Sequence, residues 1–295
     1  MKCRTLTALL LCLAATACSD VSLPVAAPQL VIEGWIENGG HPVVMVTTTV
    51  SVDESFSDIN ELEEHVVNWA KVTVSDGEND IVLTGQRNDD YFPPYIYTTS
   101  RMRGVAGGTY TVTVEYSGRT ASAVTTIPAP VPLEYIRIMQ SSDDADSYYL
   151  AGGLRDNPDT KDYYKVFTKR LGKDSTYVSS FMGLTDDSVL NAEIEEIPIN
   201  NGVGRVDEKL NAFFSADDVV HVRFCTLDRA SWEYWSDFEE IQSLSRNPFF
   251  PITTAIRSNV TGGLGYWAGY GATTCCVSIP DSLVHNLTVM PGTSL

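Results

Sequence analysis

The stretch that decides the fold reads Tyr110-Thr111-Val112-Thr113-Val114-Glu115-Tyr116, followed by the turn Ser117-Gly118 and a second run from Thr120 to Thr126. Apolar or aromatic residues alternate with polar ones, and this period of two puts the first set on one face of a β-strand. A short glycine-bearing turn between two such runs is typical of a hairpin. The stretch therefore predicts two antiparallel strands with one apolar face.

The same pattern extends toward the N-terminus. Residues 30–35 alternate, residues 43–52 are rich in valine and threonine, and Ser75-Asp76-Gly77 separates two further short apolar runs. Strands at short spacing without helical periodicity predict an antiparallel β-sandwich over residues 29–127, of immunoglobulin-like or carboxypeptidase-regulatory-like type. Three alternating prolines within residues 128–132 then predict a stiff, extended linker that ends this domain.

The second half of the chain also begins with strand patterns, at residues 135–139, 163–169 and 219–226. Residues 231–244 differ, because large apolar side chains recur there every three residues, as in an amphipathic helix. Asp228 or Ser231 is the expected N-cap, and Asn247-Pro248 the stop. The sequence thus predicts a mainly β protein of two domains, the second covering residues 133–295 with one helix. The helical aromatics fit core packing better than a ligand platform.

The N-terminus has the features of an export signal. A basic start, a short apolar run and the small residues before Cys18 predict a lipoprotein signal peptide over residues 1–17. Lipidation of Cys18 would then anchor the chain to a membrane, with residues 18–28 as a tether. The alternative is an ordinary signal peptide in which Cys18 is incidental.

Charge narrows the choice of partners. The chain has 20 basic and 38 acidic residues, a net charge of −18, and loss of Lys2 and Arg4 with the signal peptide makes it more acidic still. Such a surface repels phosphate backbones, which argues against nucleic acid as a partner. It also repels anionic headgroups, so we expect membrane contact only through the lipid.

Three cysteines remain in the body of the chain, Cys225, Cys275 and Cys276. In an oxidising compartment outside the cytoplasm, a bridge from Cys225 to Cys275 or Cys276 is plausible, with one thiol left over. Three buried free thiols are the alternative. The spacing does not decide between them.

Motifs that carry catalysis are absent from the sequence. The four histidines are scattered, and no zinc-ligand spacing, nucleophile elbow or phosphate-binding loop occurs. The acidic loop at Asp143, Asp144 and Asp146 lacks the glycine and glutamate of a calcium loop. We therefore predict no catalytic residue, no metal and no cofactor, although 38 acids leave room for an unrecognised carboxylate pair.

The most distinctive local stretch runs from Asn259 to Gly271 and interleaves five glycines with three large rings. Glycines permit tight turns and close approach of other backbones, so one interpretation is a folding constraint. The other is a contact surface for a partner protein. The candidate contact residues are Asn259, Gly262, Gly263, Gly265, Tyr266, Trp267 and Tyr270.

Several stretches together resemble a known family. They are Gln29-Leu30-Val31-Ile32-Glu33-Gly34-Trp35-Ile36 after the lipobox, Tyr110 to Val114 leading to Thr126-Ile127-Pro128, and Asn247-Pro248-Phe249 followed by Ser258 to Tyr266. In order and position they are similar to the DUF4249 (domain of unknown function) lipoproteins of Bacteroidota. That family has no established catalytic residues to carry over.

The resemblance implies an outer-membrane lipoprotein that acts beside a TonB-dependent transporter in nutrient uptake, as an accessory or binding module. Only Asp20 follows the lipidated cysteine as an acid, where surface-exported relatives carry several, so the face of the outer membrane stays open. The alternatives are a cell-surface glycosidase or peptidase with an unrecognised acidic site, and an adhesin or structural envelope protein. An enzyme should show two converging carboxylates in a deep pocket, whereas a binding module should not.

Overall fold

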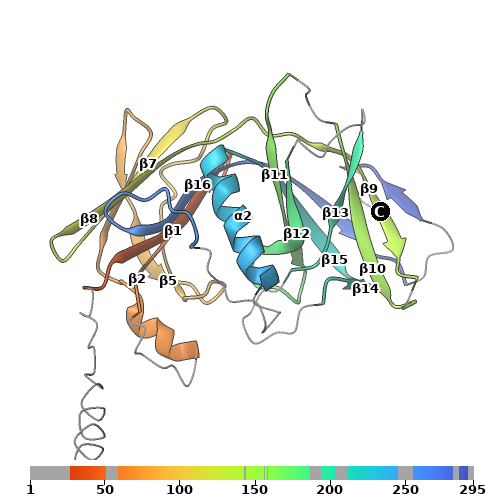
Figure 1. The fold of residues 1–295 in the computed structure, drawn as a ribbon, viewed down its shortest axis with the longest axis horizontal. Coiled ribbons are helices and arrows are strands. Elements are labelled where there is room, and N and C mark those ends of the chain that lie inside the picture. The colour runs from red at the N-terminus through yellow and green to blue at the C-terminus, as the bar shows by residue number, and fades with distance from the viewer. Residues whose placement is uncertain are drawn as a thin grey trace, which may run out of the picture.

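The computed structural model describes residues 27–50, 59–142, 144–155, 157, 159–186, 194–202, 211–244, 255–281 and 286–291. These residues form seventeen β-strands, one α-helix and one 3₁₀ helix, which confirms the prediction of a mainly β protein built from antiparallel sandwiches (Figure 1). The strands are β1 Leu30–Glu37, β2 Val43–Thr48, β3 Lys71–Ser75, β4 Asp80–Val82, β5 Thr84–Arg87, β6 Tyr95–Thr98, β7 Thr109–Tyr116, β8 Arg119–Thr126, β9 Leu133–Gln140, β10 Ser147–Leu154, β11 Tyr163–Arg170, β12 Val178–Asp186, β13 Glu195–Ile199, β14 Phe214–Ser215, β15 Val219–Leu227, β16 Leu264–Ser278 and β17 Leu287–Val289. The helices are η1 Ile59–His65 and α2 Arg229–Leu244.

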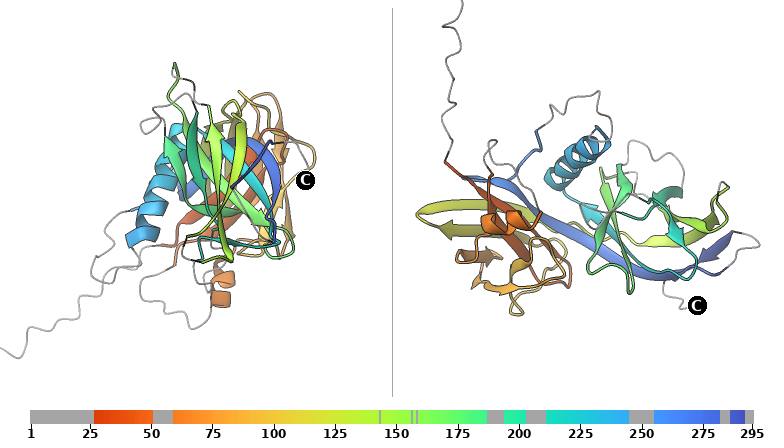
Figure 2. Two further views of the ribbon diagram at one scale, coloured as in Figure 1. Left: turned by 90° about the vertical axis from the view of Figure 1, so that its right-hand side faces the viewer. Right: turned by 90° about the horizontal axis from the view of Figure 1, so that it is seen from below.

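An eight-stranded sheet runs through the whole molecule in the order β12-β11-β15-β16-β1-β2-β6-β5. Its centre is the long strand β16, which pairs antiparallel with β15 from Tyr270 to Ser278 and parallel with β1 from Leu264 to Tyr270. Figure 2 shows β16, in blue, passing from the N-terminal half of the chain to the C-terminal half. One shared strand therefore joins the two halves into a single sheet.

Two smaller sheets cover the same face of this large sheet, which we call the inner face. The four-stranded sheet β4-β3-β7-β8 covers one end, and the five-stranded sheet, with β13-β10-β9-β17 in order and β14 beside β10, covers the other. Ile32 and Ile36 of β1 point into the first core, and Val220 and Val222 of β15 into the second. Because side chains alternate along a strand, the residues between them point to the opposite, outer face.

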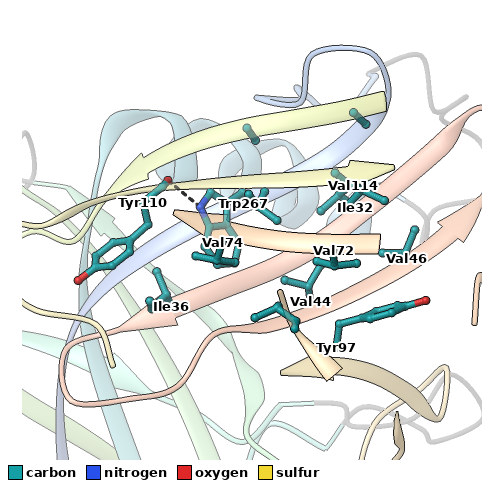
Figure 3. Packing of buried hydrophobic residues seen from close by; sticks show 14 of the residues in the cluster. Ile32, Ile36, Val44, Val46, Val72, Val74, Tyr97, Tyr110, Val114 and Trp267 are labelled. Atoms are coloured by element: carbon teal, nitrogen blue, oxygen red, sulfur yellow. Dashed lines mark hydrogen bonds between the residues drawn. The ribbon is translucent and has the colours of Figure 1, made fainter. Parts of the chain in front are cut away.

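The hairpin β7–β8 forms one wall of the first core, as predicted. Tyr110, Val112 and Val114 are buried, and Ser117 and Gly118 form a two-residue turn with φ of 50° and 74°. Two positive φ angles in sequence suit the twist of a tight hairpin. Figure 3 shows the valines of the two sheets interdigitating beside Trp267 of β16.

The domain boundary differs from the one expected. The chain does cross from the first core to the second around residues 128–132, since Ile127 belongs to the first and Leu133 to the second. However, Trp267, from the second half of the chain, lies in the first core. Residues 133–295 are therefore not a separate unit, because β16 completes the first sandwich before it enters the second.

Helix α2 confirms the predicted amphipathic helix and begins two residues earlier than expected. Of the two expected caps, Asp228 fills the role, because its carboxylate accepts a hydrogen bond from the Ser231 N–H at 2.8 Å. The helix lies across the outer face, where Trp235 packs edge-on against Phe167 of β11. Its aromatic stripe thus packs on the sheet, as the spacing indicated, with Trp235 buried and Trp232 and Phe238 partly buried. No helix among the described residues is long and apolar enough to cross a membrane.

Candidate functional site: a groove on the outer face

A groove of about 860 Å³ crosses the outer face of the large sheet. We call it the junction groove, because residues from both halves of the chain line it. Strands β1 and β2 contribute from the first half and strands β11, β15 and β16 from the second, while α2 forms one wall. Sites between two parts of a protein are common places for small ligands. The shared sheet therefore creates a concave surface that neither half has alone.

The floor of the junction groove follows from the alternation in β1. Glu33, Trp35 and Glu37 of β1 alternate with the buried Ile32, Gly34 and Ile36 and point to the outer face. The parallel register places Glu33 opposite Tyr266 of β16. The floor thus carries acids and aromatic rings side by side.

Two loops close one end of the junction groove. The loop after β5 contributes Tyr91, whose ring lies 6.0 Å from that of Trp35. The loop after β11 contributes Ser175, whose hydroxyl donates a hydrogen bond to the Asp90 carbonyl at 3.0 Å. This hydrogen bond joins the two halves of the chain a second time, at the end of the groove where Tyr91 lies beside Trp35.

Glu33 has an unusual environment for an acid. Its side chain is exposed to the junction groove, and desolvation by the surrounding protein raises the pKa of the carboxyl. The Tyr266 hydroxyl donates a hydrogen bond to Glu33 Oε1 at 3.3 Å, which offsets the desolvation only in part. Burial also raises the pKa of Tyr266 well above its usual range, and the Glu33 charge adds to this. Tyr266 is therefore held as a proton donor toward Glu33.

Glu37, further along the same face of β1, is neutralised by a cation. Arg223 Nη1 of β15 lies 3.2 Å from Glu37 Oε2, and the guanidinium carbon lies 3.7 Å from the centre of the Tyr177 ring. This stacked ion pair spans the two halves of the chain. Glu37 therefore has a cation as its partner, whereas Glu33 has only the Tyr266 hydroxyl beside it.

Beneath α2, the buried Lys165 of β11 forms an ion pair with Glu239 of the helix. The ammonium group also lies 5.1 Å from the centre of the Trp235 ring. Burial lowers the pKa of Lys165, while the Glu239 charge and hydrogen bond act in the opposite direction. The pair fixes the helix on the sheet and so positions one wall of the junction groove.

The stretch Asn259 to Gly271 does not form the partner surface that was one of its two interpretations. Trp267 is fully buried, and its indole N–H donates to the Tyr110 carbonyl at 3.0 Å (Figure 3). The Asn259 side chain holds the backbone of Trp267 through two hydrogen bonds, of 2.8 and 3.0 Å. Tyr266 and Tyr270 are buried on the outer face and line the junction groove.

The glycines of this stretch serve the close approach of other strands. A Cβ atom on Gly265 would lie 1.9 Å from the Ile32 carbonyl oxygen, and its φ is +104°. Cβ atoms on Gly262 and Gly263 would lie 2.3 and 2.6 Å from the carbonyl oxygens of Thr120 and Leu30. The folding constraint is therefore the interpretation that the structure supports, and the predicted partner contact is withdrawn.

The bridge expected from Cys225 is not formed, because Cys225, Cys275 and Cys276 are all free. The register gives the reason. Cys275 pairs with Val222, on the face opposite to Cys225, while Cys276 pairs with His221, four residues along the strand from Cys225. Four residues span about 13 Å, whereas a disulfide needs Cα atoms within about 7 Å. Cys18 and its predicted lipid lie outside the described residues.

The chain belongs to the family described as domain of unknown function DUF4249, which matches residues 19–275. No curated protein matches the sequence. Within the described ranges, no three histidine, cysteine or acidic side chains gather in a way that could hold a metal ion.

Sequence reasoning did not single out Glu33 as a site residue, although a signal was present. In residues 30–37, the acids Glu33 and Glu37 stand on the same face of a strand that is otherwise apolar. An acid on a central strand flanked on both sides by other strands is unusual. That the face carries a groove depends on β16 and α2, which are distant in sequence.

Proposed function

We propose that this chain is a lipid-anchored binding module of the bacterial outer membrane, which holds a ligand in the junction groove and works beside a TonB-dependent transporter in nutrient uptake. The observation that carries the proposal is the junction groove itself. It has the volume of a small-molecule site and a mixed lining of rings and a few charged groups.

Binding fits the groove better than hydrolysis, because two of the acids that line it with Glu33, namely Glu37 and Asp174, are each neutralised by an arginine. Glu37 is four residues further along β1, about 13 Å away by strand geometry, and Arg223 neutralises it. Glycosidases place their two carboxyl groups roughly 5 to 9.5 Å apart. Asp174, which also lines the groove, is bound at 2.6 Å by Arg170.

The anchor in this proposal is the lipid on Cys18. The family match covers residues 19–275 and does not include Cys18. Since Trp267 is buried in the first core, the outward rim of α2 is the candidate surface for a transporter. A co-anchored pair needs only a modest interface, since confinement raises the effective concentration of each partner.

Ligand retention tests the role of the junction groove. Full-length protein is purified from its native envelope in mild detergent, and the small molecules that it releases on denaturation are identified by mass spectrometry. Val43→Trp fills the groove from β2, and Val82→Trp, on exposed β4, is the matched control. We expect a molecule that the wild type and Val82→Trp retain and Val43→Trp loses. Equal retention by all three proteins, or no retained molecule, contradicts the proposal.

The anchor and partner are tested in the same membranes. Cys18→Ser should release the protein from the membrane fraction, because it removes the thiol that carries the lipid. A TonB-dependent transporter should co-purify with the wild-type protein after mild solubilisation. Unchanged membrane association of Cys18→Ser contradicts the anchor, and pull-downs without a transporter contradict the partnership.

A further inference from the structure

The carboxylate of Glu33, on the floor of the junction groove, forms no ion pair with a residue that the structure describes. Its two strand neighbours across the sheet are Met45 of β2 and Tyr266 of β16. Neither brings a positive charge, and within the part of the chain that the structure describes the carboxylate accepts one side-chain hydrogen bond, from the Tyr266 hydroxyl. Among the described residues, none of the recorded ion pairs includes Glu33.

The cations that line the junction groove are already engaged elsewhere. Arg223 pairs with Glu37 at 3.2 Å, and Lys173 pairs with Asp218 at 2.6 Å. Arg87 contacts Asp89 at 2.8 Å and Glu63 at 3.8 Å. His41 is also held, since its Nδ1 lies 2.7 Å from the Met102 carbonyl. Each basic lining residue named here therefore already has a partner, and none of them lies beside the Glu33 carboxylate.

The surroundings of Glu33 are aromatic. Trp35 follows on the same face of β1, and the Tyr266 ring lies 4.0 Å from that of Tyr234 on α2. Ring faces attract cations, and the attraction grows when water is excluded. A carboxylate beside aromatic rings that line a groove is thus complementary to a positive group attached to an apolar body.

We infer that the junction groove binds an organic cation, an amine or guanidine carried on an apolar or aromatic body, with the charged group against Glu33 and the body against Trp35 and Tyr266. This inference rests on the proposed binding function and adds the chemical class of the ligand. A metal ion would need several oxygen ligands, which one carboxylate does not supply. An anion would meet both Glu33 and the overall charge of −18.

The test uses three probes of one shape and different charge: tryptamine as the cation, N-acetyltryptamine as the neutral form and indole-3-propionate as the anion. Binding is followed by methyl NMR on detergent-solubilised full-length protein with labelled methionines. Met45 lines the groove beside Glu33, and Met182, on exposed β12, is the internal control. We expect tryptamine to shift the Met45 methyl but not that of Met182, and to bind roughly ten-fold more tightly than N-acetyltryptamine.

Two variants locate the effect. Glu33→Gln removes the unpartnered charge and should abolish the preference for tryptamine, while Glu63→Gln removes a charge from the same groove that is already near Arg87 and should leave the preference intact. If the neutral or anionic probe shifts Met45 as strongly as tryptamine, the cation class is wrong but groove binding stands. If Glu33→Gln keeps the preference, Glu33 is not the site. If no probe shifts Met45, both the inference and the binding function are contradicted.

Discussion

Two tryptophans of this chain lie in opposite environments. Trp267 is fully buried in the first core, and its indole N–H is satisfied by the Tyr110 carbonyl. Trp69 has 89% of its surface exposed. Trp267 therefore contributes packing and a buried hydrogen bond to the fold, whereas Trp69 contributes neither.

Replacing Trp267 by alanine should lower the free energy of unfolding by about 3 to 5 kcal/mol, since a large cavity and an unpaired carbonyl remain. Trp69→Ala is the matched control and should change it by less than about 0.5 kcal/mol. Urea denaturation of the full chain measures both. Similar losses in the two variants would contradict the placement of Trp267 in the core.

The pKa of Glu33 links the stability of the protein to pH. Desolvation raises this pKa above the ordinary value of 4.5, so the folded protein holds the proton more tightly than the unfolded chain does. As pH rises from about 4.5 through the folded-state pKa, ionisation of Glu33 therefore lowers the free energy of unfolding. Below about pH 4.5 the group is protonated in both states and has no such effect. Glu33 is thus held in the groove at the expense of stability, as is common for residues kept for binding.

Glu33→Gln removes this cost. The variant should unfold at the same free energy as the wild type below about pH 4.5 and become increasingly more stable than it toward neutral pH. Denaturation curves of both proteins at each pH give the difference in their free energies of unfolding. The other carboxyl groups contribute equally to both proteins, so their effect drops out of this difference. A variant that is less stable than the wild type at neutral pH would show that the Glu33 charge is compensated.

At the level of elements, α2 is held to the sheet by rings and by one buried charge. Lys165 is completely buried, and Glu239 is its partner. Breaking such a pair leaves an uncompensated charge, whereas removing both members often costs little. The wall of the junction groove therefore depends on both residues being present or both being absent.

A double-mutant cycle tests this coupling. Glu239→Gln alone should destabilise the protein by about 3 kcal/mol, and Lys165→Met combined with Glu239→Gln should recover most of the loss. Thermal or urea unfolding of the four proteins gives the coupling. Losses that simply add would mean that the two side chains act independently and that the rings alone hold the helix.

Elements that depend on local pattern could be predicted from the sequence. The hairpin β7–β8 follows from alternation and from Ser117-Gly118, and α2 follows from its three-residue spacing and the Asp228 cap. Both signals lie within about 16 residues, a length over which side-chain periodicity, turn residues and helix caps can be read directly from the sequence.

The role of β16 could not be predicted, because its partners are far away in the chain. Its parallel pairing with β1 joins residues more than 230 positions apart, and nothing local in Asn259 to Gly271 distinguishes a strand between two cores from a partner surface. The junction groove and Glu33 were missed for the same reason, since each depends on that pairing.

At the level of the whole molecule, the two cores are parts of one structure. The long strand β16 passes through both halves (Figure 2). It contributes Trp267 to the first core and Val277 to the second, both on the inner face of the large sheet. The junction groove keeps its shape only when both halves are folded, because its floor combines strands from each. Binding and stability should therefore respond together to changes in either core.

The most direct test of this central claim is differential scanning calorimetry of the full chain, with one variant in each core. We predict a single cooperative transition whose midpoint falls both in Trp267→Ala, in the first core, and in Ile138→Ala, in the second. Two transitions, each shifted by only one of the variants, would instead mean two independent domains and would contradict a groove built from a shared sheet.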